Sequence, residues 1–151
     1  MELVLLIGLQ GSGKSSFYRE RFAATHALVS KDLFPNARNR EKRQRRELEA
    51  AWTAGRSVVL DNTNATRADR ALVIAAARAR ECSVVGYYFE SRVEECLRRN
   101  RIRGNPVPDV AIYSTIARLE RPRREEGFDA LHHVRIEDGG GFRVTDWIEE
   151  P

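Results

Sequence analysis

Lysine is scarce in this chain of 151 residues, which carries 26 basic and 22 acidic side chains and a net charge of +4. Only Lys14, Lys31 and Lys42 are lysines, so the remaining 23 basic residues are arginines. The planar guanidinium grips phosphate through two hydrogen bonds, so the excess favours a phosphate or nucleic-acid partner. A GC-rich genome would enrich arginine equally well, and the positions of the charges must decide between the two explanations.

Cysteine and histidine are also scarce, with two and three residues respectively. Cys82 and Cys96 form no CxxC pair and have no histidine pair nearby, which argues against a disulfide scaffold or a zinc site and predicts buried, reduced thiols. The apolar run at the N-terminus ends at Gly8, too early for a signal peptide or a membrane span. We therefore expect a cytoplasmic protein that does not interact with membranes.

The remaining pattern alternates apolar strands with helices along the whole chain. Strands are predicted at 3–7, 27–30, 57–61, 83–89 and 131–136, and helices at 14–24, 40–54, 66–80, 93–103 and 109–119. Because the strands are apolar throughout, they belong to a parallel sheet that is covered on both faces. We predict one α/β domain over residues 1–151, with a five-stranded parallel sheet flanked by helices.

The strongest motif follows the first strand and matches GxxxxGK[ST], the P-loop of nucleoside triphosphatases. Its glycines let backbone N–H groups turn toward phosphate oxygens, and the helix that follows adds a favourable dipole. Lys14 is expected to reach the β- and γ-phosphates, and the Ser15 hydroxyl to bind Mg²⁺. The predicted nucleotide-binding residues are Gly8, Gln10, Gly11, Ser12, Gly13, Lys14, Ser15 and Ser16.

Two aspartates stand where predicted strands end, Asp32 after the second and Asp61 at the end of the third. In an open parallel sheet, ligands bind beyond the carboxyl ends of the strands, so both carboxylates should face the nucleotide. One could take a proton from an acceptor hydroxyl, and the other could hold the metal through water or orient the acceptor. A turn-forming or helix-capping role is the alternative for each.

Two arginine clusters complete the set of candidate residues. The segment 98–103 (RRNRIR) precedes Gly104 and two prolines, so it could close over the nucleotide as part of a lid at about residues 98–112, with Arg99, Arg101 and Arg103 as candidates. The segment 38–46 holds six basic residues and one acid, and could line a path for an anionic acceptor. A solvated helix face is the alternative explanation for both clusters.

Taken together, these motifs resemble the polynucleotide 5′-kinases, the P-loop phosphotransferases of nucleic-acid end repair. The likeness runs from about residue 3 to 136 and rests on the order of several short motifs. These are Asp61-Asn62-Thr63-Asn64, Asn100-Arg101-Ile102-Arg103, Val107-Pro108-Asp109-Val110 with Tyr113, and Glu126-Gly127-Phe128.

The resemblance implies a role for several residues. It implies that Asp32 is the general base that deprotonates a 5′-hydroxyl and that Arg103, with Arg101 as second choice, contacts the transferring phosphate. Residues Asp61, Asn62, Thr63 and Asn64 would lie near the acceptor. The phage pattern has an acceptor-gripping arginine three residues after the base, where this chain has Pro35, so Arg38 or Arg40 is expected to substitute.

The sequence therefore predicts an ATP- and Mg²⁺-dependent kinase of 5′-hydroxyl ends of DNA or RNA. One alternative is a P-loop kinase of a small-molecule hydroxyl, such as a nucleoside, a sugar or an antibiotic. Another is an NTPase switch without an acceptor, which would leave Asp32 and the lid arginine without a function. DNA or RNA as acceptor, the preferred nucleoside triphosphate and the oligomeric state stay open.

Overall fold

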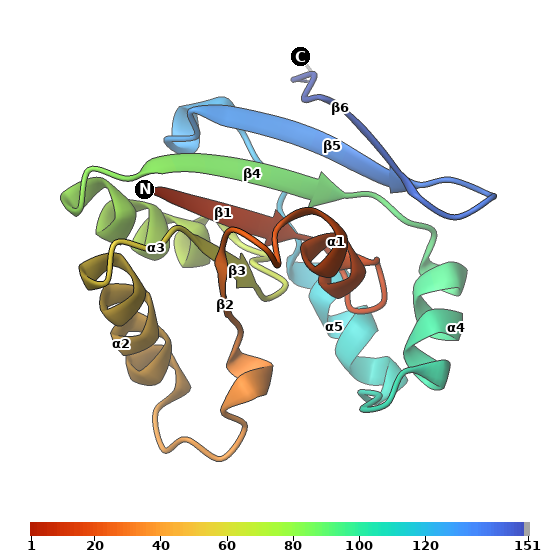
Figure 1. Cartoon of the computed structure of the whole chain (residues 1–151). Helices are drawn as coiled ribbons and strands as arrows, with labels where there is room; N and C mark the ends of the chain where they lie inside the picture. Colours follow the sequence, from red (N-terminus) through yellow and green to blue (C-terminus); the bar gives the residue numbers. More distant parts are fainter. Residues whose placement is uncertain (150–151) are drawn as a thin grey trace.

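The strands form one sheet in the order β2-β3-β1-β4-β5-β6 in the computed structural model, which describes residues 1–149 (Figure 1). The first five strands are parallel, which confirms the predicted α/β class. The segment predicted only as a glycine turn and a short tail adds β6, antiparallel to β5. The strands are β1 (Glu2–Ile7), β2 (Ala27–Val29), β3 (Val58–Asp61), β4 (Ser83–Phe89), β5 (Ala130–Ile136) and β6 (Phe142–Asp146).

The helices start and end close to where local signals place them. The Thr66 hydroxyl accepts a hydrogen bond from the Asp69 backbone N–H at 3.1 Å and so caps the start of the third helix. Gly55, with φ +76°, follows the end of the second helix. The elements are α1 (Lys14–Arg21), α2 (Arg40–Thr53), α3 (Arg67–Ala79), α4 (Val93–Ile102) and α5 (Asp109–Arg118), with the 3₁₀ turns η1 (Lys31–Leu33) and η2 (Arg124–Glu126).

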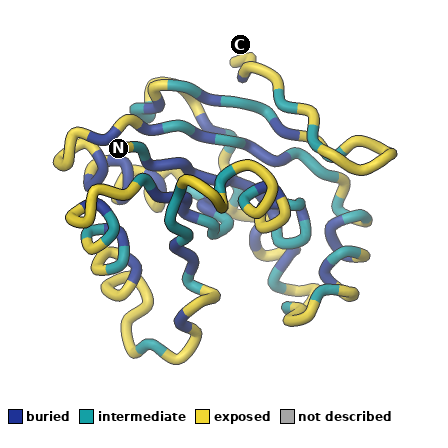
Figure 2. The backbone as a smooth tube through the Cα atoms, viewed as in Figure 1, coloured by how far each residue is buried: buried dark blue, intermediate teal, exposed yellow. Residues whose placement is uncertain are grey.

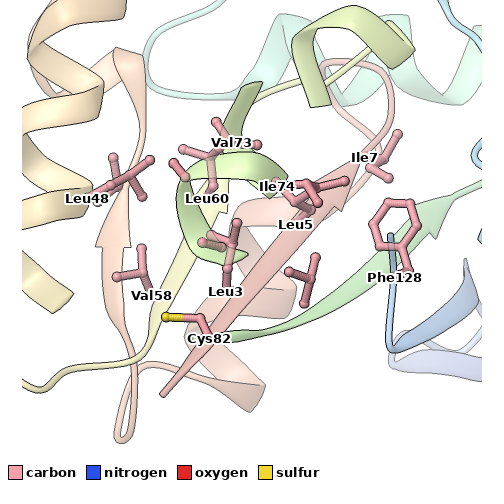
Figure 3. Close-up of a cluster of buried hydrophobic side chains, with 14 of the residues drawn as sticks. Leu3, Leu5, Ile7, Leu48, Val58, Leu60, Val73, Ile74, Cys82 and Phe128 are labelled. Atoms are coloured by element: carbon pink, nitrogen blue, oxygen red, sulfur yellow. The ribbon is translucent and has the colours of Figure 1, made fainter. Parts of the chain in front are cut away.

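The central strand β1 is buried on both faces, which explains its unbroken apolar sequence (Figure 2). Leu3 and Leu5 pack with side chains of α2 and α3, as the close-up in Figure 3 shows. Val4 and Leu6 pack on the opposite face with Phe17 of α1. None of the helices within residues 1–149 is long and apolar enough to cross a bilayer.

Both cysteines are buried free thiols, as their spacing predicted. Cys82 belongs to the core cluster beneath α2 and α3, and Cys96 lies in a separate cluster with Leu9, Leu97 and Ile112. Burial raises the pKa of each thiol, so both are held in the neutral form. The cluster that contains Cys96 packs α4 and α5 against the glycine-rich loop.

Candidate active site

The glycine-rich loop joins β1 to α1 and adopts backbone conformations that only glycine takes easily. Gly11 has φ +78° and Gly13 has φ +99°. A Cβ atom on Gly11 would stand 2.4 Å from the carbonyl oxygen of Cys96 in α4. The loop therefore needs glycine for two reasons, its left-handed backbone and its close contact with α4.

We predict that Gly11→Ala destabilises the protein and weakens nucleotide binding. The new methyl group must move α4 or the loop, and the backbone must keep a left-handed conformation, together roughly 1–3 kcal/mol of lost stability. Thermal unfolding with and without ATP measures both effects. Gly139→Ala is the matched control, because a Cβ atom there meets nothing within 4 Å. Unchanged melting and unchanged ATP stabilisation in Gly11→Ala would show that α4 does not constrain the loop.

Lys14 lies at the start of α1 and is only 8% exposed. Its Nζ donates hydrogen bonds to the carbonyl oxygens of Gly8 and Leu9, both at 2.8 Å. Burial lowers the pKa of the ammonium, and the positive charge of Arg103 acts in the same direction, while Asp61 opposes them. The Lys14 ammonium is thus held by the carbonyl oxygens of the loop. Phosphate oxygens of a bound triphosphate would compete with those carbonyl oxygens for its hydrogen bonds.

Ser15 and Asp61 meet across the sheet edge because β3 lies directly beside β1, with Leu6 in register with Asp61. The Ser15 hydroxyl donates to Asp61 Oδ2 at 2.8 Å. A hydroxyl and a carboxylate are the hard oxygen ligands that Mg²⁺ prefers, and Mg²⁺ usually takes few protein ligands besides substrate phosphates. The pair therefore fits a Mg²⁺ ion that is shared with a nucleotide.

The three residues after Asp61 hold neighbouring backbone in place. Asn64, in a left-handed conformation with φ +47°, donates to the carbonyl oxygens of Leu6 and Leu60 at 2.7 and 3.3 Å. The Thr63 carbonyl accepts from the Gly8 N–H at 3.1 Å. Both contacts fix the start of the glycine-rich loop against β3.

Asn62 joins the loop after β3 to two other elements. Its side chain accepts from the Lys31 backbone N–H at 3.0 Å and donates to Gln44 of α2 at 2.7 Å. These bonds occupy the amide on both sides and fix η1, which carries Asp32, against the sheet edge. The structure thus gives Asn62 a bracing position within the predicted acceptor set.

Asp32 projects from η1, whose start is capped by the Ser30 hydroxyl. Its side chain is 73% exposed, and its Oδ1 lies 3.9 Å from Nη2 of Arg40. Within residues 1–149, Arg40 is its one ion-pair partner, and a carboxylate so exposed is free to accept a proton from a bound molecule. Arg40 is the one of the two expected substitutes that lies beside it.

The arginines of the predicted lid point in different directions. Arg103 lies at the end of α4 and faces the same cavity as Lys14. Arg99 donates to the Gly11 carbonyl at 3.2 Å and pairs with Glu95. Arg101 pairs with Asp109 at 3.1 Å on the surface and does not line the cavity. Of the first and second choices, Arg103 therefore lies at the cavity and Arg101 does not.

A single cavity of about 790 Å³ gathers most of the predicted site residues. This volume suits a small-molecule site, which typically spans about 300–1,000 Å³. Of the predicted residues, it is lined by Gln10, Gly11, Gly13, Lys14, Ser15, Ser16, Asp32, Asp61, Asn62, Thr63, Asn64, Arg99 and Arg103. The predicted site residues that do not line it are Gly8, Ser12, Arg38 and Arg101.

Several residues around the cavity were not predicted from the sequence. Arg118 of α5, Arg19 of α1 and Leu72 of α3 line it, and they come from helix faces whose direction single residues do not reveal. Arg70 of α3 is fully buried, pairs with Glu126 at 2.8 Å, and donates to the carbonyl oxygen of Asn64. Arg70 lies on the apolar face of α3. A basic residue on the apolar face of a predicted helix could have indicated from the sequence that Arg70 is buried and paired.

The fold and the loop together define a kinase-type P-loop protein. A family model described as an AAA domain matches residues 3–122, and the chain belongs to that family. A bifunctional polynucleotide phosphatase/kinase of Schizosaccharomyces pombe is 29% identical over 140 residues, which are 88% of this chain. The match spans about a third of that relative's length, 33%.

Two solved structures share the fold at lower identity. A sugar kinase from Janibacter sp. HTCC2649 superposes with a TM-score of 0.65 at 21% identity, covering 89% of this chain and 85% of the other. A fungal RNA kinase superposes with a TM-score of 0.64 at 16% identity, covering 88% of this chain and 38% of the other. Proteins with these differently named acceptors therefore share this architecture.

Proposed function

We propose that this protein transfers the γ-phosphate of ATP to the 5′-hydroxyl end of DNA or RNA. The observation that carries the proposal is one cavity that joins the glycine-rich loop to Asp32 from η1 and Arg103 from the α4–α5 turn. A nucleotide switch needs the loop but has no evident use for an exposed carboxylate beside it. The similarity to a polynucleotide phosphatase/kinase supports the choice of acceptor.

In the proposed reaction, the hydroxyl oxygen of the acceptor attacks the γ-phosphorus in line with the leaving ADP, and Asp32 accepts the proton of that hydroxyl. Lys14 and Arg103 stabilise the negative charge that spreads over the γ-phosphate oxygens. Ser15 and Asp61 would hold Mg²⁺, which neutralises phosphate charge when it is bound. We thus assign Asp61 to the metal side of the cavity and Asn62 and Asn64 to bracing.

A transfer screen with γ-labelled ATP tests the proposal. Oligonucleotides of DNA and RNA with 5′-hydroxyl ends, nucleosides and gluconate are incubated side by side, with and without Mg²⁺. We expect label on an oligonucleotide, only with Mg²⁺, and none on an oligonucleotide that already carries a 5′-phosphate. Label on gluconate or a nucleoside, and on no oligonucleotide, would show that the acceptor is a small molecule. ATP hydrolysis without transfer to any acceptor would indicate a nucleotide switch.

One observation favours a compact acceptor over an extended one, and so keeps the small-molecule kinase as a second candidate. Within 38–46, Arg40, Arg43 and Arg45 are each paired with an acidic residue. Of the arginines and the lysine in that segment, only Arg40 lines the cavity. The cluster that appeared strongly positive in the sequence is therefore partly neutralised in the fold.

We predict a weak salt dependence for acceptor binding. Each phosphate of a single strand that is neutralised contributes a slope of about −0.7 to a plot of log affinity against log salt. Because only the terminal nucleotide would meet basic side chains in the cavity, we expect a slope no steeper than about −2. Binding of a 5′-hydroxyl dinucleotide and a 20-mer across a salt series measures it. A much steeper slope for the 20-mer alone would show that the strand runs along α2.

A further inference from the structure

The turn between α4 and α5 carries Arg103 into the cavity, and Val107 is the residue of the turn that packs against the hydrophobic cluster around Leu9. Residues 104–106 are exposed, and a Cβ atom on Gly104 would meet nothing within 4 Å. The turn lies at the lower right of Figure 1, where the two helices meet. Pro106 and Pro108 have no backbone N–H, so Val107 offers the sole backbone donor from 106 to 108.

Asn100, in the last turn of α4, holds this backbone through both ends of its side-chain amide. Its Oδ1 accepts from the Val107 N–H at 3.0 Å, and its Nδ2 donates to the Val107 carbonyl at 2.6 Å. The residue is 1% exposed. The Arg103 N–H also donates to the Asn100 carbonyl, at 3.4 Å. One buried residue therefore connects both sides of the turn that carries Arg103.

The helices on either side of the turn are fixed by other contacts. The Gln10 amide donates to the Thr115 hydroxyl of α5 at 3.1 Å. Leu9 packs with Cys96 and Leu97 of α4 and with Ile112 of α5. The body of α4 and α5 is thus fixed against the glycine-rich loop, whereas the turn is held by the packing of Val107 against this cluster and by the two hydrogen bonds between Asn100 and the Val107 backbone.

We propose that Asn100 is a positioning residue that fixes the turn 103–107 so that Arg103 faces the transferring phosphate. The inference rests on the proposed function, because it assigns Asn100 an effect only through Arg103. Asn100 itself does not line the cavity. A loss of the two bonds to Val107 would leave the binding of ATP by the glycine-rich loop intact while displacing the guanidinium.

Asn100→Asp tests this, because it keeps the size of the side chain but replaces the donor to the Val107 carbonyl by an acceptor. Asn100→Leu removes both bonds without adding a charge. We expect kcat to fall roughly 10- to 100-fold in both variants, as misplacement of a catalytic group by about an ångström does, with the KM for ATP changed less than about threefold. Asp109→Asn, which removes the acidic charge from the exposed contact between α5 and Arg101, is the matched control and should keep wild-type rates.

A double-mutant cycle with Arg103→Ala separates positioning from a general loss of stability. If Asn100 acts through Arg103, its substitution costs less than about twofold in kcat once Arg103 is alanine. An equal factor in both backgrounds would overturn the proposal. If Arg103→Ala leaves the rate of transfer unchanged, Arg103 does not contact the transferring phosphate, and the proposed role of Asn100 is excluded with it.

A measurement that does not depend on activity completes the test. Trypsin cleavage after Arg103 is followed by mass spectrometry at a temperature well below the melting point. We expect several-fold faster cleavage in both Asn100 variants than in wild type and Asp109→Asn. Equal cleavage rates would overturn the claim that Asn100 holds the turn, whether or not the protein phosphorylates nucleic acid.

Discussion

Replacing Asp32 by asparagine lowers the rate of phosphoryl transfer by roughly 10²- to 10⁴-fold, the range that general base catalysis contributes. The amide cannot accept the hydroxyl proton, yet it has the size of the carboxylate. The backbone N–H of Asp32 keeps its bond to the Ser30 hydroxyl. Because the side chain is 73% exposed, the free energy of unfolding should change by no more than about 0.5 kcal/mol.

Steady-state transfer with saturating ATP and acceptor measures this effect. Asp138→Asn, a change of the same chemistry at another exposed carboxylate, is the control and should transfer at the wild-type rate. The KM for ATP should also stay near the wild-type value in Asp32→Asn, since the Lys14 and Ser15 side chains are untouched. Near-normal transfer by Asp32→Asn would exclude Asp32 as the base and leave the acceptor proton to solvent.

The sequence predicted the five parallel strands because buried strands have an unmistakable signal, a short apolar run that ends at a glycine or a polar residue. β6 has no such run. Phe142 and Val144 are half-buried and alternate with the exposed Arg143, a pattern over five residues that is too short to distinguish from a tail. Its pairing with β5 depends on the hairpin around Gly140 and Gly141.

The glycine-rich loop and the two aspartates were predictable because each sits at the end of a strand, and the topology of a parallel sheet brings such ends together. The partners of these residues were not predictable. The sequence left open whether Asp61 serves the metal or the acceptor, and the position of β3 beside β1 gives it Ser15 as a partner. That neighbour relation is a property of strand order, which no local pattern encodes.

The basic cluster at 38–46 shows a second limit of sequence reasoning. Along the chain it has one acid among six basic residues, but α2 places Arg43 beside Glu47 and Arg45 beside Glu49. Each acidic partner lies four positions further along the helix, beyond the end of the segment 38–46 in which the charges were counted. Charge counted along a sequence therefore overstated the charge that the folded surface presents.

Lys14→Met is the second substitution with a large expected effect. Its influence on the pH dependence of stability can be derived from the protein without a ligand. Burial lowers the pKa of Lys14 below its ordinary value of 10.5. Between the lowered value and 10.5, the unfolded chain binds this proton and the folded chain does not, so stability rises with pH across that interval. The variant lacks this contribution. The difference in unfolding free energy, wild type minus variant, should therefore increase as the pH rises toward 10.5 in urea titrations.

We expect Lys14→Met to reduce phosphoryl transfer by roughly 10²- to 10³-fold, because a donor aimed at developing phosphate charge is lost from a buried site. The stability of the unliganded protein at pH 7 should change by only about 1 kcal/mol, since relief of a buried ammonium offsets the lost bonds to Gly8 and Leu9. Transfer assays, thermal melts and ATP titrations on one preparation measure all three properties. Lys14→Arg should also lose activity, because a planar guanidinium does not reproduce the single-point bonds of Nζ to the Gly8 and Leu9 carbonyl oxygens. Retained activity in Lys14→Met would mean that the cation reaching the γ-phosphate is Arg103 or another arginine of the cavity.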